Sequence, residues 1–82
     1  MELKRGQVVF SLSGKDKGTA LVVTEVKGTS IYVCDGKRRP LERPKMKNPK
    51  HVQKTGILFS EDTMKTNAQL KKAIRALSSK EE

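Results

Sequence analysis

Three short runs of β-forming residues, separated by glycine-containing turns, fill most of residues 8–34. The runs are "VVF", "TALVVTEV" and "IYVC", at residues 8–10, 19–26 and 31–34. Valine, isoleucine and aromatic residues favour strands, and glycine accepts the positive φ of a tight hairpin. Because isolated hairpins are barely stable in water, the runs predict an antiparallel meander that closes into a small barrel. A further strand in "TGILF", residues 55–59, is expected to close the sheet.

A short helix is expected near the end of the chain. Thr66 is the predicted N-cap, and Gln69 follows three residues later, as in a capping box. Apolar residues recur there at helical spacing: Leu70, Ala73, Ile74 and Leu77. A helix of about three turns is marginal alone, so its apolar stripe must dock on the barrel or on a partner. We therefore expect a barrel domain at 1–60, including a basic loop at 35–54, and a helix with a frayed tail at 61–82.

The size of the chain and its cysteine content restrict its function. A chain of 82 residues forms one small domain with a modest core, and a large internal active-site cavity is not expected. A single cysteine allows no intramolecular disulfide, and the first ten residues lack the apolar region of a signal peptide. No window approaches the roughly 20 apolar residues of a membrane span. We predict a cytoplasmic location.

The basic segment at 35–54 is the most unusual part of the sequence. It holds eight Lys or Arg and all three prolines, in a chain whose net charge is +9. Each proline fixes φ, removes a backbone donor and biases the preceding residue toward extended conformations, so we expect an extended, kinked loop or at most an edge strand. Such charge attracts polyanions: RNA, DNA, anionic lipid surfaces or acidic protein faces. Nucleic acid is favoured among them, because it offers a phosphate lattice for many cations together.

Two groups of residues are the candidate RNA contacts. In the turn at 13–18, glycine lets the backbone approach a phosphate, with lysines beside it. The alternative is that the glycines only permit the turn and that the basic segment is a solvated charge run. Arginine adds bidentate phosphate contacts and stacking. The candidates are Lys15, Lys17, Gly18, Lys37, Arg38, Arg39, Arg43, Lys45, Lys47, Lys50 and Lys54.

The scarcity of aromatic residues distinguishes between modes of RNA recognition. The chain has one Tyr, two Phe and no Trp, too few rings for the stacking platforms of single-strand readers. Recognition of the shape and backbone of structured RNA is therefore favoured. Phe10 and Phe59 are expected in the core, whereas Tyr32 is equally suited to the core and to stacking on a base.

Catalysis and metal binding are not expected. Cys34 and His51 are 17 residues apart and lack further ligand-like spacing, so they are too few for a zinc site. A Cys/His nucleophile would need a cleft that so small a chain scarcely builds. Cys34 is expected to be a small buried hydrophobe on the same strand face as Tyr32. We predict no enzymatic activity and no cofactor.

The stretch "GQVVFSLSGKDKGTALVVTEV" resembles the KOW motif, a β-loop-β element of translation and transcription proteins with a glycine at the end of its loop, here Gly18. Further along, "VCDGKRRPLERPKMKNPKHV" is similar to short bacterial KOW-domain proteins related to the fourteen-e family of large-subunit ribosomal proteins. The resemblance covers roughly residues 4–54. It implies a mainly β fold, a small SH3-like antiparallel barrel of KOW type that contacts ribosomal RNA through loops and a basic extension. The resemblance also adds His51 to the candidate RNA contacts, although His51 is equally suited to an ordinary surface position.

We therefore predict a non-enzymatic, monomeric RNA-binding protein associated with the ribosome or with translation. The main alternative is a KOW-type module that docks on ribosomal or transcription-machinery proteins, because acidic protein surfaces would accept the same charge. A peripheral membrane binder is less favoured, since the basic helix is short and lacks interfacial aromatic residues. In the helix, Lys71, Lys72 and Arg75 are a possible second RNA contact.

Overall fold

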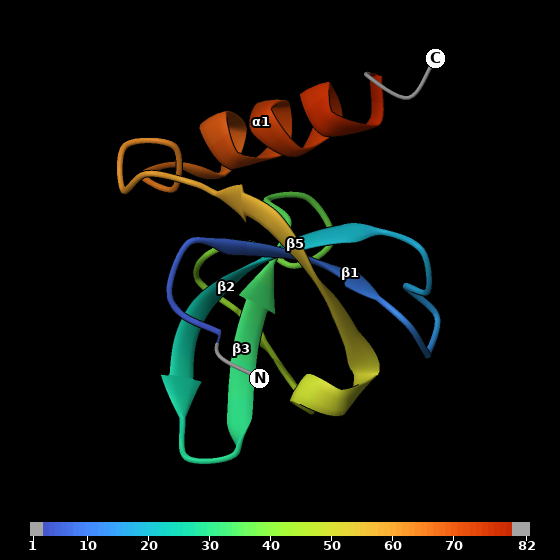
Figure 1. Ribbon diagram of the computed structural model, residues 1–82. Helices are drawn as coiled ribbons and strands as arrows, with labels where there is room; N and C mark the ends of the chain where they lie inside the picture. Colours follow the sequence, from blue (N-terminus) through green and yellow to red (C-terminus); the bar gives the residue numbers. More distant parts are fainter. Residues whose placement is uncertain (1–2, 80–82) are drawn as a thin grey trace.

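A computed structural model describes residues 3–79 of the chain. It is mainly β, with five antiparallel strands in one sheet and one C-terminal helix (Figure 1). The order across the sheet is β4-β3-β2-β1-β5. The elements are β1 (Gln7–Ser11), β2 (Ala20–Lys27), β3 (Ser30–Cys34), β4 (Lys45–Lys47), a 3₁₀ turn η1 (Pro49–His51), β5 (Val52–Leu58) and α1 (Asn67–Ser79). The predicted mainly β architecture with a C-terminal helix is confirmed.

The first half of strand β2, residues 20–23, is buried on both faces, which explains its continuous apolar run. Successive side chains of a strand point to opposite sides, so Leu21 and Val23 face one core while Val22 faces another. The first core, the inner cluster, contains residues from four strands: Val9, Leu21, Val23, Ile31, Val33 and Val52. The second core, the helix-side cluster, contains Val22, Cys34, Met64 and Leu70. The strands of the sheet therefore enclose the inner cluster, and helix α1 packs on the sheet through the helix-side cluster.

The helix docks on the sheet, one of the two sites expected from the sequence. Leu70 is fully buried in the helix-side cluster, and Ile74 packs against it one turn later. The backbone amide of Gln69 donates to Thr66 Oγ1 at 3.2 Å, so Thr66 caps the helix as predicted. Figure 1 shows α1 lying across the sheet. The helix includes residues 78–79 of the predicted frayed tail, and residues 80–82 lie outside the described part of the chain.

The basic segment is less extended than predicted. Residues 35–44 form two successive turns, in which the Arg39 carbonyl accepts the Asp35 amide at 3.0 Å and the Pro40 carbonyl accepts the Arg43 amide at 2.9 Å. Extended structure in the segment is confined to β4, an edge strand as the prolines allow, and to residues 52–54 at the start of β5. The cations of residues 37–39 are consequently gathered together, whereas an extended loop would have spread them along a line.

The last strand is longer than expected and irregular. It begins at Val52, not at residue 55, and its register against β1 shifts between the partners of Gln7 and Val9. The buried Gln7 side chain compensates for the shift, since its Nε2 donates to the carbonyls of Thr55 and Ile57 at 2.7 and 3.1 Å. A polar side chain thus repairs the backbone bonding that the irregularity removes.

Candidate nucleic-acid interface

Five of the predicted RNA contacts converge on one hollow in the surface, which we call the basic hollow. Lys15 comes from the loop between β1 and β2, and Lys45 from edge strand β4. The loop after β3 supplies Lys37, Arg38 and Arg39. The hollow measures about 530 Å³, and Asp16, Thr19, Leu21 and Asp35 complete its lining. Two stretches of sequence that were separate candidates therefore form one continuous cationic surface.

Asp16 ties the β1–β2 loop to strand β4. Its Oδ1 accepts the Ser11 hydroxyl at 2.8 Å and the Lys47 ammonium at 3.3 Å, and its Oδ2 lies 3.9 Å from Lys45 Nζ. Burial alone would raise the pKa of Asp16. The hydrogen bonds from Ser11 and Lys47, with the charges of Lys47 and Lys45, outweigh burial and hold that pKa below its ordinary value. Asp16 is therefore a carboxylate that fixes the loop beside the strand.

Lys47 has an internal position that differs from that of the other candidates. Only 7% of its side-chain surface is exposed, and its ammonium also donates to the Ser13 carbonyl at 3.3 Å. Its charge is held inside the fold by Asp16 and the loop backbone. Lys47 therefore acts on the basic hollow through its contact with Asp16 and is not one of its surface cations.

Asp35 organises the loop that carries three of the cations. One oxygen, Oδ1, accepts the backbone amides of Lys37 and Arg39 at 2.8 and 2.9 Å. This bonding closes a compact turn in which the side chains of Lys37, Arg38 and Arg39 are exposed. Their arrangement is therefore built into the fold before any ligand binds.

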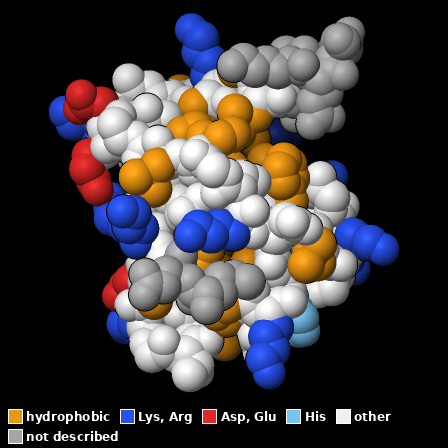
Figure 2. All heavy atoms as spheres, viewed as in Figure 1, with side chains coloured by type: hydrophobic (Ala, Val, Ile, Leu, Met, Phe, Trp, Pro, Cys, Tyr) orange, Lys and Arg blue, Asp and Glu red, His pale blue; other side chains and the backbone are white. Residues whose placement is uncertain are grey.

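The remaining candidates lie elsewhere on the surface. Lys17, Gly18 and Lys54 line a separate hollow beside Phe10 and Leu12. On the face in Figure 2, Lys and Arg side chains stand apart from one another, and hydrophobic side chains gather beneath α1.

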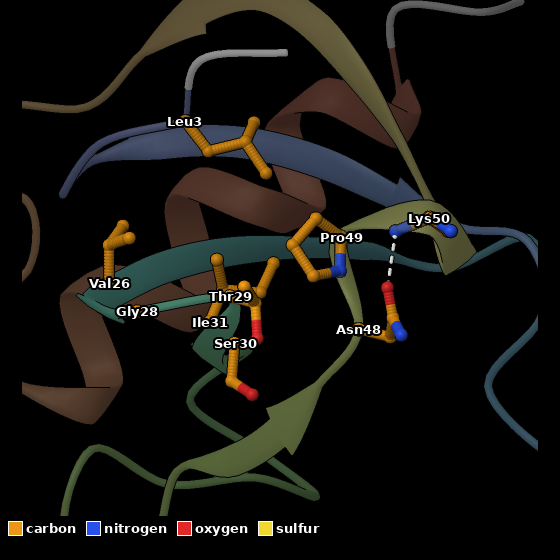
Figure 3. Close-up of a pocket in the computed structure, with 9 residues that line it drawn as sticks. All are labelled: Leu3, Val26, Gly28, Thr29, Ser30, Ile31, Asn48, Pro49 and Lys50. Atoms are coloured by element: carbon orange, nitrogen blue, oxygen red, sulfur yellow. Dashed lines mark hydrogen bonds between the residues drawn. The ribbon is translucent and has the colours of Figure 1, made fainter.

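Lys50 lies at another hollow, with Leu3 and Pro49 (Figure 3), where its backbone amide donates to Asn48 Oδ1 at 2.9 Å. Arg43 is exposed in the turn before β4, and His51 is exposed at the end of η1. These three candidates do not line the basic hollow.

The glycines of the β1–β2 loop have a conformational role. Gly14 and Gly18 have φ of +85° and +87°, a region that other residues rarely adopt. A Cβ atom on Gly18 would meet no heavy atom within 4 Å, so the backbone conformation alone explains glycine there. The surface above Gly18 is open to a ligand.

Cys34 is fully buried, as expected, and its thiol donates to the Pro40 carbonyl at 3.4 Å. Burial raises the pKa of the thiol to about 11. Within residues 3–79, no three His, Cys, Asp or Glu side chains form a group that could hold a metal ion. Over the same range, no helix has the length and apolar character needed to cross a bilayer. Cys34 is thus a packing residue of the helix-side cluster.

Sequence reasoning missed the two acids that shape the interface. Neither Asp16 nor Asp35 is among the candidate contacts above, although each positions cations. The dipeptide Asp35-Gly36 could have indicated the second, since aspartate before glycine commonly closes a turn onto its own backbone. No protein-family model matches the chain, and a search of curated proteins finds no match. The functional conclusion therefore depends on the residues themselves.

Proposed function

We propose that the protein is a non-enzymatic RNA-binding protein of the ribosome or translation machinery, built on a small SH3-like barrel of KOW type. The observation that carries this proposal is the convergence of Lys15, Lys37, Arg38, Arg39 and Lys45 on one hollow. Several fixed cations close together match the repeated charge of a phosphate backbone better than any single anionic group. The observed five-stranded antiparallel sheet supports the SH3-like barrel. The KOW-like motif supports both that barrel and the ribosomal setting.

The ligand is structured RNA, and recognition is through its backbone. None of the residues that line the basic hollow is aromatic. Of the three aromatic residues, Phe59 packs against the helix-side cluster and Phe10 lines a different hollow. Tyr32 is partly buried in β3. Without a ring for stacking, the hollow has phosphate contacts as its main means of binding.

The test is charge reversal with a matched control. Arg38→Glu with Arg39→Glu removes two cations from the basic hollow, while Lys27→Glu with Lys65→Glu makes the same change in net charge on exposed residues outside it. Fluorescence anisotropy with a labelled ribosomal RNA fragment should show that the first variant loses most of the affinity and that the control keeps most of it. Equal losses would show that only net charge matters and would overturn the assignment of the site. Circular dichroism confirms that both variants fold.

A further inference from the structure

The basic hollow continues onto the helix through a second hollow that shares two of its residues. This helix hollow, of about 400 Å³, is lined by Asp35, Lys37, Lys71, Ile74 and Arg75. Asp35 and Lys37 also line the basic hollow. The two hollows therefore meet at the loop after β3, and Lys71 and Arg75 extend the same cationic surface onto α1.

The helix is held firmly in relation to this loop. Asn67, the first residue of α1, accepts the Leu41 amide at its Oδ1 at 2.7 Å and donates from Nδ2 to Glu42 Oε1 at 2.9 Å. Gly36 lies so close to the helix that a Cβ atom there would come within 2.9 Å of the Lys71 amide nitrogen. The buried Leu70 fixes the rotation of the helix. Lys71 and Lys37 consequently belong to one rigid surface.

The neighbouring lysine of the helix lies on a different side. Lys72 lines a hollow with Asp62, Thr63, Gln69, Ala73 and Ala76, none of which borders the basic hollow. Lys71 and Lys72 are adjacent and both exposed, so they provide a matched pair on one element. Any difference in RNA binding between variants of these two lysines is therefore due to the position of each lysine and not to the charge of the helix in general.

We propose that a helical RNA segment lies along a single track that runs from the β1–β2 loop across Lys37 to α1. This inference rests on the proposed function and deepens it by naming the class of RNA. Neither hollow is lined by an aromatic residue, so the track offers cations for the backbone and no ring for an unstacked base. Cations placed on both sides of Lys37 suit the regular phosphates of a duplex, whose backbone is held in place before binding.

Neutralising one lysine at a time tests the track. Binding of a labelled 20-base-pair RNA duplex is measured by anisotropy over a range of salt concentrations for wild type, Lys71→Gln and Lys72→Gln. Lys71→Gln should weaken binding and lower the slope of log affinity against log salt by about 1, while Lys72→Gln should leave the slope unchanged. Equal slopes for the two variants would overturn the track. If the slopes are equal but Arg38→Glu with Arg39→Glu still abolishes binding, the track is wrong and the proposed function stands.

Replacement of Asp35 is a second test of the track, and here RNA binding is expected to become tighter. Asp35→Asn keeps an oxygen that can accept the amides of Lys37 and Arg39, but it removes a negative charge where the two hollows meet. The variant should bind the duplex several-fold more tightly than wild type. Unchanged or weaker binding by the folded variant would contradict a phosphate path across this loop.

The class of ligand is tested with the wild-type protein. The duplex should bind more tightly than a single strand of the same sequence and more tightly than poly-glutamate of equal charge, both measured by competition. A single strand that binds as well as the duplex would overturn the assignment of helical RNA. Poly-glutamate that competes as well as the duplex would indicate an acidic protein partner and would overturn the RNA proposal as well.

Discussion

Asp16 shows how one carboxylate organises several cations. It is not a ligand contact itself, yet it fixes Lys47 inside the fold and draws Lys45 toward the loop that carries Lys15. A negative charge inside a basic surface would ordinarily weaken anion binding. Here Lys47 and Lys45 offset that charge and Ser11 donates a hydrogen bond to the carboxylate, so the surface gains a fixed shape at little electrostatic cost.

The replacement Asp16→Asn should destabilise the protein in a pH-dependent way. Because the folded pKa of Asp16 is below its ordinary value of 3.8, its contribution is fully present above that value and is lost as the pH falls through the folded pKa. We expect a loss of about 1 kcal/mol in the free energy of unfolding at pH 7, and this loss should shrink as the pH is lowered below 3.8 through the folded pKa. Urea denaturation of both proteins across this range measures the difference.

Asp62→Asn is the control for this prediction. The Asp62 side chain is 90% exposed and makes only a 3.9 Å ion pair with Lys65, so its replacement should have almost no effect. The difference in unfolding free energy between wild type and Asp16→Asn could instead stay constant from pH 7 to pH 2. That result would show that the carboxylate charge does not cause the loss of stability.

The contact between the loop after β3 and helix α1 depends on Gly36. Its φ is +80°, and a Cβ atom would lie 2.6 Å from the Asn67 carbonyl oxygen. Gly36→Ala should therefore cost about 3 kcal/mol, from backbone strain combined with displacement of the helix. Gly28→Ala is the matched control, because Gly28 has φ of +57° but open space around it, and strain alone should cost about 1 kcal/mol. Equal losses on chemical denaturation would refute the close approach.

The strands and the helix were predictable because their signals are local. The apolar run of β2 and the Thr66 cap each depend on residues a few positions apart. A turn at Asp35-Gly36 was predictable from the dipeptide, but its packing was not, since Gly36 and Leu41 are held by α1, which begins at Asn67. The burial of Lys47 likewise depends on Asp16, 31 residues earlier in the chain. Contacts between distant elements thus decided which predicted cations share a surface.

For the molecule as a whole, the central prediction is salt-dependent association with ribosomal particles. Contact with about five phosphates gives a slope of log affinity against log salt of about −3.5 to −4.5. In sucrose gradients of native lysate, the protein should migrate with ribosomal particles at low salt and at the top at high salt. RNase treatment should release it, and Arg38→Glu with Arg39→Glu should stay at the top throughout.

Two other outcomes of the gradient would count against this prediction. Retention on particles after RNase treatment would indicate a protein tether, the alternative function expected for a KOW-type module. Migration of the wild type at the top at every salt concentration would remove the ribosomal setting. RNA binding measured with the purified protein would still test the basic hollow independently.

The two edges of the sheet have a consequence for how the protein behaves at high concentration. At one edge, β4 is only three residues long and turns the charged Lys47 inward; at the other, β5 is distorted where its register shifts. Short strands, inward-pointing charges and bulges all hinder the addition of a strand from another molecule. The lysines of β4 therefore have a second use, as a barrier to self-association and aggregation. Their replacement by valine would favour fibres even where the fold survives.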